Sequence, residues 1–450
     1  MKNILLLGAG KSSHVLIKYL FSNAERENWQ ITVADISLDS AQANVGSHSN
    51  GKAIALDVTN AQQREDAVSA SDLVISLLPP ALHLLAAKDC LKFKKHLVTA
   101  SYVSPEMNAL NDDVLDNHLV FLNECGLDPG IDHMSAMKII DKVHEAGEKI
   151  TEFRSYTGGL IAPESNNNPW GYKFTWNPRN VILAGQGTAK YLLDGKIKEV
   201  EYKDLFLHTE KINVPPYGTF EGYPNRDSLS YIELYGLEGI STMLRGTLRY
   251  EGFCKAWNVF VQLGLTDDSH MIENSGNMTY AALVESLLPA SSLEKNIWKR
   301  VELRCGEGIN STAMKKAEWS GIFSDETIPL NHASPAQILQ NLLEKKWKLE
   351  EGDKDMIVMQ HHFSSEGQGT GDKRQGKKII SSLVVKGDDA VDTAMAKTVG
   401  LPLGIAAKLI LSDKIKNRGV MIPVNKEFYA PVLKELEGFG IVFREEEIEY

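Results

Sequence analysis

The chain has 450 residues, of which 43% are hydrophobic and 24% are charged, and its formal net charge is −11. This length allows roughly two or three domains with sizeable cores. The acidic balance argues against a nucleic-acid partner, and no apolar run approaches the length of a membrane span. The four cysteines show neither a disulfide framework nor a metal-ligand spacing. We therefore expect a cytoplasmic protein that holds no metal and binds neither nucleic acid nor membrane.

The first stretch of the chain predicts a dinucleotide-binding turn. An apolar run, Ile4 to Leu7, leads into Gly8-Ala9-Gly10, and a helix-compatible segment follows. Gly8 permits a tight turn and Gly10 lets the backbone approach a pyrophosphate, while the small Ser13 stands where a third glycine is usual. A second apolar run ends in Asp35, close to the spacing of a ribose-binding carboxylate. The alternative is a glycine turn that binds nothing.

Strand-like and helix-like runs alternate through the first third of the chain. The strand-like runs are residues 4–7, 31–35, 53–57, 73–77, 96–99 and 119–122. Short apolar strands separated by helices predict an α/β fold with a parallel sheet wound on both faces. Ligands gather at the carboxyl ends of the strands in such sheets, and these ends carry Gly8, Asp35, Asp57, Leu78, Thr99 and Asn123.

The rest of the chain predicts a mixed domain and a helical region. Residues 145–270 and 355–386 favour a largely antiparallel β domain, and segments 280–288, 293–303 and 335–344 favour helices. Residues 364–376 are rich in Gly, Ser and charge, which predicts a mobile loop between two strands. We expect a final helix, from 390 to about 411, to be interrupted at Gly400 and Pro402.

Two segments that follow predicted strands carry groups suited to proton transfer. The Tyr102 hydroxyl in Ser101-Tyr102 could move or orient a proton, and a loop-capping tyrosine is the alternative. Asp128 lies in Gly-Leu-Asp-Pro-Gly, where Pro129 fixes φ and Gly130 permits an unusual backbone. A carboxylate held in this way suits a base or a counter-ion for a developing cation, and the alternative is an Asp turn bonded to its own backbone. His133 is expected to be a packed histidine.

Three arginines lie beside polar loop or strand residues. Arg226 follows Tyr-Pro-Asn, and Arg245 and Arg249 flank Thr247 in one strand-like run, where alternate residues face the same side. The planar guanidinium matches a carboxylate well. Surface ion pairing is the alternative for any one of them, and the cluster favours a site for a small polycarboxylate.

With these segments in view, the whole chain resembles saccharopine reductase, the L-glutamate-forming saccharopine dehydrogenase family of lysine metabolism. The matching stretches recur in one order from residue 4 to about 420. Besides the glycine turn they are Asp72–Leu77, Thr99–Pro105, Asn123–His133, Gly158–Ser165, Asn168–Phe174, Tyr223–Ser228, Leu244–Gly252, Trp319–Asp325, Ala394–Lys397 and Arg418–Val420.

The resemblance implies an α/β fold with a variant Rossmann domain, a mixed α/β substrate domain and a small all-helical domain. The first would be residues 1–130, the second residues 131–272 and 346–389, and the third residues 273–345. The tail, about 390–450, is a candidate to pack back on the first domain. A homodimer is left open.

The resemblance also implies a reaction and its site. Glutamate and α-aminoadipate semialdehyde would join in an imine that a nicotinamide hydride reduces to saccharopine, or the reverse. Asp128 and Tyr102 would handle protons and charge. The residues implied in contact with saccharopine are Ser101, Tyr102, Asp128, Arg226, Thr247, Leu248 and Arg249. Those implied in contact with the dinucleotide are Gly8, Ala9, Gly10, Lys11, Ser12, Asp35, Ile36, Ser37, Asp57, Val58, Leu78, Ala100, Ser101, Leu127, Asp128, Pro129 and Thr175.

Two departures from the fungal pattern bear on the chemistry. Asp35-Ile36-Ser37 stands where fungal members have Cys-Arg-Thr, and an aspartate there accepts from a free ribose hydroxyl and repels a 2′-phosphate. This predicts a preference for NAD(H) over the family's NADP(H). Thr157 replaces a cysteine, so no thiol is available at that position. The rival functions are an imine-reducing enzyme of another amino acid or polyamine, and a dinucleotide-binding regulator without catalysis.

Overall fold

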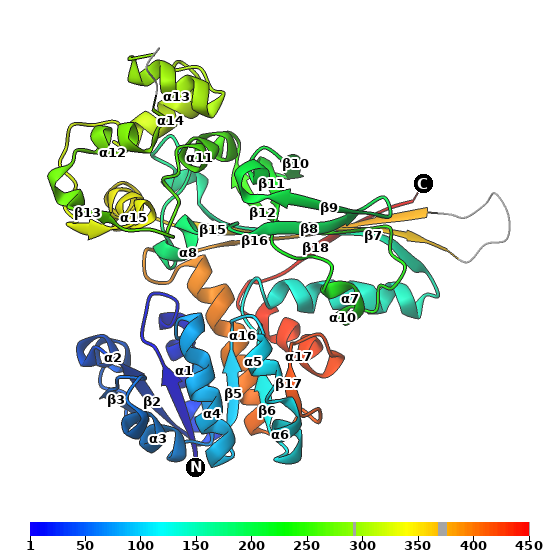
Figure 1. Cartoon of the computed structure of the whole chain (residues 1–450). Helices are drawn as coiled ribbons and strands as arrows, with labels where there is room; N and C mark the ends of the chain where they lie inside the picture. The colour runs from blue at the N-terminus through cyan, green and yellow to red at the C-terminus, as the bar shows by residue number, and fades with distance from the viewer. Residues whose placement is uncertain (291–293, 368–375, 450) are drawn as a thin grey trace. The chain divides into compact units, whose positions relative to one another are not determined.

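The computed structural model describes residues 1–290, 294–367 and 376–449, and it forms two compact units (Figure 1). The first unit is built from Met1–Lys149 and Leu383–Glu445. The second is built from Ile150–Glu366 with the described residues of Gln375–Ser382 and Glu446–Tyr450. The region predicted to be a separate helical domain, 273–345, lies within the second unit, and its independence stays a prediction.

The first unit is centred on a seven-stranded sheet in the order β17-β6-β5-β4-β1-β2-β3. Every pairing in it is parallel, which confirms the predicted α/β class. Central strands of such a sheet are covered on both faces, and the apolar run of β1 is accordingly buried from Ile4 to Leu7. The strands are β1 (Lys2–Leu7), β2 (Trp29–Asp35), β3 (Gly51–Ala55), β4 (Leu73–Ser76), β5 (His96–Thr99), β6 (Val120–Leu122) and β17 (Gly419–Met421).

The strand order reverses between β1 and β4, the neighbours at the centre of the sheet. In open parallel sheets a ligand crevice forms outside the carboxyl ends of the strands at such a point. The helices of this unit are α1 (His14–Glu27), α2 (Leu38–Val45), α3 (Ala61–Ser69), α4 (His83–Phe93), α5 (Pro105–Asn108), α6 (Asn111–Asp116), α7 (Ile131–Glu145), α16 (Ala394–Leu411) and α17 (Lys426–Glu437).

The predicted interruption of the final long helix is wrong, because α16 runs unbroken through Gly400 and Pro402. The glycines allow close approach to α1: a Cβ on Gly400 would lie 2.9 Å from the Leu16 nitrogen, and one on Gly404 would lie 2.4 Å from Tyr19 Cδ1. Pro402 removes one helical hydrogen bond, but burial along almost the whole helix holds its backbone in place.

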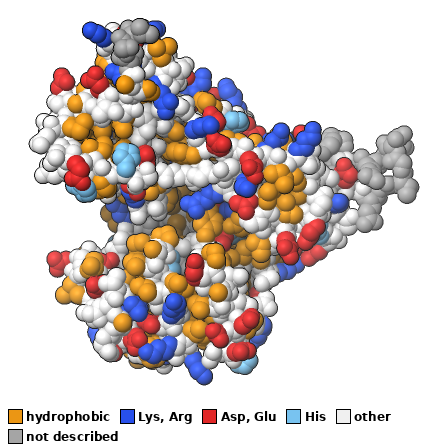
Figure 2. All heavy atoms as spheres, viewed as in Figure 1, with side chains coloured by type: hydrophobic (Ala, Val, Ile, Leu, Met, Phe, Trp, Pro, Cys, Tyr) orange, Lys and Arg blue, Asp and Glu red, His pale blue; other side chains and the backbone are white. Residues whose placement is uncertain are grey.

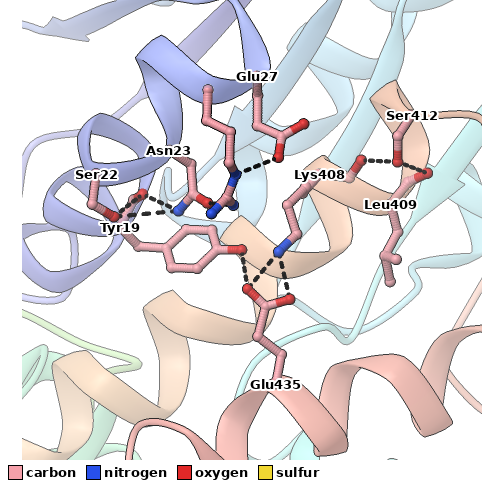
Figure 3. Close-up of polar contacts among 9 residues, drawn as sticks. Tyr19, Ser22, Asn23, Glu27, Lys408, Leu409, Ser412 and Glu435 are labelled. Carbon is pink, nitrogen blue, oxygen red and sulfur yellow. Dashed lines mark hydrogen bonds and ion pairs between the residues drawn. The ribbon is translucent and has the colours of Figure 1, made fainter.

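The tail also adds an edge strand and a polar cluster to the first unit. β17 pairs in parallel with β6. Glu435 of α17 accepts from the Tyr19 hydroxyl at 2.6 Å and from Lys408 Nζ at 2.5 Å, so it joins α1, α16 and α17 (Figure 3). α16 is long and apolar enough to span a bilayer, but 78% of its 18 residues are buried within the protein. Its apolar composition is therefore that of a core helix.

The second unit is built on a nine-stranded sheet whose main path is β10-β11-β12-β7-β15-β16-β18, with β8 and β9 attached at β12. The prediction of a mixed β domain is confirmed, but β12 and β7 pair in parallel within it. Its strands are β7 (Lys149–Ile161), β8 (Thr188–Leu193), β9 (Lys196–Glu201), β10 (Glu210–Val214), β11 (Gly218–Pro224), β12 (Thr242–Tyr250), β15 (Asp355–Glu366), β16 (Gly376–Lys386) and β18 (Arg444–Glu449).

An aromatic core joins this sheet to the helices of the second unit. Trp170, Trp257 and Trp347 are each fully buried and contact one another with ring centroids 5.3–6.2 Å apart. The helices are α8 (Pro178–Ile182), α9 (Tyr202–Leu205), α10 (Tyr231–Leu234), α11 (Phe253–Gln262), α12 (Tyr280–Leu287), α13 (Ile297–Cys305), α14 (Thr312–Trp319) and α15 (Pro335–Lys346), beside a two-stranded ribbon of β13 (Ile272–Glu273) and β14 (His332–Ala333).

The predicted mobile loop, 364–376, is only partly within the described residues. Its first residues, 364–366, belong to β15, and its last, Gly376, begins β16, so the strands are longer than predicted. Residues 368–375 lie outside the described residues.

On the face shown in Figure 2, Lys and Arg side chains are mixed with Asp and Glu and form no basic stripe.

Candidate functional site

The glycine turn after β1 has the backbone that the sequence predicts. Gly8 has φ +102°, and its N–H donates to the Ala34 carbonyl at 2.8 Å. A Cβ on Gly8 would lie 3.1 Å from the Leu77 carbonyl oxygen, whereas one on Gly10 would meet nothing within 4 Å. Gly8 is therefore required by the fold, and the open space over Gly10 fits a group that approaches the backbone. α1 begins at His14, so the positive end of its dipole lies at this turn.

Asp35, at the end of β2, is bonded to the glycine turn. Its carboxylate accepts from the Ala9 N–H at 2.8 Å and from the Ser37 N–H at 2.9 Å. Ser37 in turn caps α2 by accepting from the Ser40 N–H. The carboxylate predicted to bind ribose is thus fixed beside the turn, half-buried, with Ile36 and Ser37 in the same loop.

The remaining predicted cofactor residues of the first unit follow other strands of the sheet. Asp57 follows β3, which ends at Ala55, two residues earlier than predicted. The strand ends early because Asp57 forms a turn, in which its carboxylate accepts from the N–H and the hydroxyl of Thr59 at 2.9 and 2.7 Å. These bonds lower the pKa of Asp57. Leu78 follows β4, Ala100 and Ser101 follow β5, and Leu127, Asp128 and Pro129 lie in the loop after β6.

The turn that carries Asp128 is fastened by its own backbone. Gly130 has φ +147°, and a Cβ there would lie 2.1 Å from the Gly126 oxygen. The Gly126 N–H donates to Pro129 O and the Ile131 N–H donates to Gly126 O, both at 2.9 Å. Asp128 is half-buried, and the peptide bond between it and Pro129 is cis. The prediction that Gly130 supplies an unusual backbone is confirmed.

A buried carboxylate joins this turn to the loop of Tyr102. The Glu124 side chain accepts from the Val103 N–H at 3.1 Å and lies 2.9 Å from His133 Nε2. The Glu124 N–H donates to the Ser101 carbonyl at 3.0 Å. Glu124 and His133 are almost wholly buried, so the two loops that present Tyr102 and Asp128 are held by one polar network. His133 is the packed histidine that was expected.

In the second unit, β12 carries two buried arginines and the predicted Thr247 and Leu248. Arg245 and Arg249 are only 6% and 5% exposed, so surface ion pairing is excluded for both. The Arg245 guanidinium lies 4.1 Å from the centre of the Tyr231 ring. The Asn225 N–H donates to the Arg245 carbonyl at 2.8 Å, which places the backbone next to Arg226 against this strand. The side chain of Arg226 itself is exposed.

Arg249 lies in an aromatic enclosure. Its guanidinium is 5.2 Å from the ring centre of Tyr172 and 5.3 Å from that of Phe253. Nη1 donates to the Leu248 carbonyl at 2.9 Å, and Nε has no hydrogen-bond partner within residues 1–290, 294–367 and 376–449. In the part of the chain that the structure describes, no carboxylate pairs with Arg249. A buried cation in this state suits an anionic ligand, since an unpaired buried charge is costly.

Two buried hydroxyls of the second unit also lack partners. Thr157 Oγ1 and Thr175 Oγ1 have no hydrogen bond within the described residues, although both threonines are less than 7% exposed. Thr157 is the register partner of Thr247 on β12. Buried polar atoms are rarely left unsatisfied, so these hydroxyls fit contacts with a bound molecule. For Thr175 this agrees with the implied cofactor role.

Sequence reasoning missed His83, Glu124 and Thr157 as candidate site residues. His83 bridges two strand ends, where its ring nitrogens lie 2.8 Å from Ser76 Oγ and 2.7 Å from Ser101 Oγ. The signal was a histidine beginning a helix beside strand-end hydroxyls. For Glu124 it was an acid in the loop that also carries Asp128, and Thr157 was singled out in the sequence only as the replacement of a cysteine. The described residues contain no group of three or more His, Cys, Asp or Glu that could hold a metal.

Two family models together match nearly the whole chain. The saccharopine dehydrogenase NADP binding domain matches residues 4–122, and the saccharopine dehydrogenase C-terminal domain matches residues 126–441. The NADP(+)-dependent, L-glutamate-forming saccharopine dehydrogenase of Schizosaccharomyces pombe is 37% identical and covers 100% of both chains. The enzyme of the same name from Saccharomyces cerevisiae is 38% identical over 99% of each chain.

Longer relatives and solved structures agree with this. The mitochondrial alpha-aminoadipic semialdehyde synthase of Bos taurus is 37% identical over 98% of this chain, which matches 47% of that protein. The apo saccharopine dehydrogenase (L-Glu forming) structure from Saccharomyces cerevisiae has a TM-score of 0.88 at 35% identity and covers 100% of both chains. A Legionella pneumophila homospermidine synthase in complex with NAD, at 11% identity and a TM-score of 0.55, shares the fold alone. The chain therefore belongs to the L-glutamate-forming saccharopine dehydrogenase family.

Proposed function

We propose that the chain interconverts saccharopine with glutamate and α-aminoadipate semialdehyde in lysine metabolism, with hydride transfer to or from a nicotinamide dinucleotide. The relatives that match it over their full length carry this activity in their names. The observation on this chain that carries the proposal is Arg249, a buried arginine that has no carboxylate partner among the described residues. Saccharopine has three carboxylates, and a guanidinium binds a carboxylate through paired, charge-assisted hydrogen bonds.

The dinucleotide would be held at the carboxyl ends of the first sheet. The open space over Gly10, the start of α1 and the fixed Asp35 fit its pyrophosphate and ribose. When bound, the dinucleotide supplies or accepts the hydride, and the protein supplies placement.

The protein's own side chains would manage protons and charge. Saccharopine is a secondary amine, and its oxidation gives a cationic iminium that water converts to glutamate and the semialdehyde. A carboxylate held rigidly at Asp128 can stabilise that cation and take a proton from the attacking water. The Tyr102 hydroxyl, in the loop fastened by Glu124, can orient the same water or the amine. Arg226, Thr247 and Arg249 would bind carboxylates, and Leu248 would line the site.

Two observations on the choice of dinucleotide oppose each other. The fungal relatives are NADP(+) enzymes by name, and the matched model of the first domain is an NADP binding domain. The preference for NAD(H) predicted from Asp35 finds no support among them. We infer that NADP(H) is the working cofactor and that the Asp35 carboxylate weakens its binding, because it lies where a 2′-phosphate would be repelled.

Asp35→Asn tests this inference, since it removes the charge and keeps an oxygen for the Ala9 N–H, at the loss of the bond from the Ser37 N–H. The ratio of kcat/KM for NADPH to that for NADH should rise by about ten-fold, or ~1.4 kcal/mol. An unchanged ratio would show that Asp35 does not determine which dinucleotide is preferred. A wild-type ratio that favours NADH would show that NAD(H) is the working cofactor.

The main test is saccharopine-dependent production of the reduced dinucleotide, followed by its absorbance. Asp128→Asn should lower kcat by about 100-fold or more, while the Kd for saccharopine changes little. Full turnover in this variant would reject the assigned role. A wild-type protein that binds the dinucleotide but shows no turnover would be the regulator instead. Turnover with an amine of fewer carboxylates in preference to saccharopine would favour the other imine-reducing enzymes.

A further inference from the structure

A buried histidine connects two strand ends of the first unit to the hydroxyl of Ser101. His83 is the first residue of α4. Its Nδ1 lies 2.8 Å from Oγ of Ser76, the last residue of β4, and 3.5 Å from Oγ1 of Thr99, the last residue of β5. Its Nε2 lies 2.7 Å from Ser101 Oγ. Ser76, Thr99 and His83 are 0%, 1% and 5% exposed.

The hydrogen-bonding needs of the buried hydroxyls decide which ring nitrogen carries the proton. The Ser76 hydroxyl has Nδ1 as its hydrogen-bond partner, and its proton has no other acceptor among the described residues. The Thr99 hydroxyl accepts from the Ser101 N–H at 3.3 Å, which leaves its proton to point toward the same ring nitrogen. A proton on Nδ1 would strand the Ser76 proton in the core, at a cost of about 1–3 kcal/mol. Nδ1 is therefore the acceptor.

The ring must then carry its single proton on Nε2. Burial lowers the pKa of His83 to about 4, so the imidazole is neutral near pH 7. Nε2–H donates to Ser101 Oγ. The Ser101 backbone is fixed as well, because its N–H donates to Thr99 Oγ1 and its carbonyl accepts from the Glu124 N–H at 3.0 Å. The one group of Ser101 left to choose a partner is its hydroxyl proton.

We propose that His83 is a positioning residue that commits Ser101 to act as a hydrogen-bond donor to a carboxylate oxygen of the substrate. The inference rests on the proposed function and on the contact of Ser101 with saccharopine that the family resemblance implies. A serine that already accepts from Nε2–H turns its own proton outward, and that proton suits an anionic oxygen rather than the substrate's amine. Ser101 is half-buried, unlike Ser76 and Thr99, which are enclosed in the core.

The first test reads the tautomer and needs no activity. Long-range ¹H–¹⁵N spectra of the full chain labelled at histidine are compared with those of His83→Phe, which identifies the His83 signals by their loss. We expect the neutral Nε2–H pattern near pH 7. A neutral Nδ1–H pattern or an imidazolium would overturn the proposal. A failed proposed function would leave this result unaffected, so the two failures are distinguishable.

The second test is kinetic and uses a double-mutant cycle. His83→Phe is combined with Ser76→Ala so that the Ser76 hydroxyl is not left in the core without a partner, while Thr99 Oγ1 still accepts from the Ser101 N–H. The pair is measured with and without Ser101→Ala. The pair alone should raise KM for saccharopine by about ten-fold, and Ser101→Ala should raise it by about 10- to 100-fold. The pair should add less than about two-fold once Ser101→Ala is present. Full additivity would overturn the proposal.

The Kd of the dinucleotide, measured by fluorescence, separates the two ligands that Ser101 is implied to contact. It should stay within about two-fold in all variants, and a loss of dinucleotide affinity in place of saccharopine affinity would overturn the carboxylate assignment. His96→Phe is the matched control. His96 is half-buried and is the first residue of β5, at the end of the strand opposite to Ser101, and its Nδ1 accepts from the Val120 N–H. It should lose stability without changing KM.

Discussion

Replacing Arg249 by Met should make the free protein more stable and the enzyme far less active. Arg249 is 5% exposed, and no carboxylate pairs with its guanidinium among the described residues. Burying a charge in this way costs several kcal/mol. About 2 kcal/mol of this cost is offset by two kinds of contact. The guanidinium lies 5.2 and 5.3 Å from the ring centres of Tyr172 and Phe253, and it donates to the Leu248 carbonyl. Met fills a similar volume without the charge.

The expected gain is therefore about 1–3 kcal/mol in the free energy of unfolding. For a unit of about 150–250 residues, each kcal/mol raises the unfolding midpoint by roughly 2–4 °C. Without Arg249, a substrate carboxylate would lose its buried charge partner, at a cost of about 2–5 kcal/mol in binding free energy. This lowers kcat/KM for saccharopine by between about 30-fold and several thousand-fold. Stability and activity should thus move in opposite directions.

Thermal unfolding and steady-state kinetics on the same preparation measure both changes. Arg154→Met is the matched control on the same sheet, because Arg154 already pairs with Glu210 at 3.0 Å and its loss should destabilise the free protein. If Arg249→Met lowers the midpoint as the control does and leaves kcat/KM within about three-fold, Arg249 is a structural residue and the reasoning is refuted.

Three further predictions concern the first unit. Gly130→Ala should destabilise it by about 3 kcal/mol or more and lower kcat, because its Cβ would overlap the Gly126 backbone; retained kcat and an unchanged urea midpoint would contradict this. Glu124→Gln should cost about 1.5–3 kcal/mol in urea unfolding, since the bond to His133 is lost; a neutral result would show that the network does not fasten the loops. Burial lowers the pKa of both His83 and His96 from 6.5 to about 4. Between these two pH values the unfolded chain therefore binds more protons than the folded chain. The free energy of unfolding should fall as the pH falls through this range, by at most about 1.4 kcal/mol per pH unit for each histidine. His96→Gln should reduce that slope, and an unchanged slope would show that His96 titrates alike in both states.

The strands of the first unit were predictable because their apolar runs are short, separated by helices, and buried on both faces. The glycine turn was predictable because the requirement is local: Gly8 has φ +102°, a backbone conformation that residues with a side chain rarely adopt. The unbroken α16 was not. Its Gly400 and Pro402 weaken an isolated helix, and its burial against α1 and the other neighbouring elements compensates for them.

The sequence by itself determined the class of the first unit, the turn for the dinucleotide and the rigid loop of Asp128, since each depends on residues close together in the chain. Only the tertiary structure decided that Glu124 joins the loops of Tyr102 and Asp128, that His83 lies against Ser101, and that Arg249 is buried without a counter-ion. These relations depend on which distant segments become neighbours and on how much water burial excludes. The sequence identifies a charged or hydroxyl side chain but does not show whether it is exposed or buried, and its surroundings decide its chemistry.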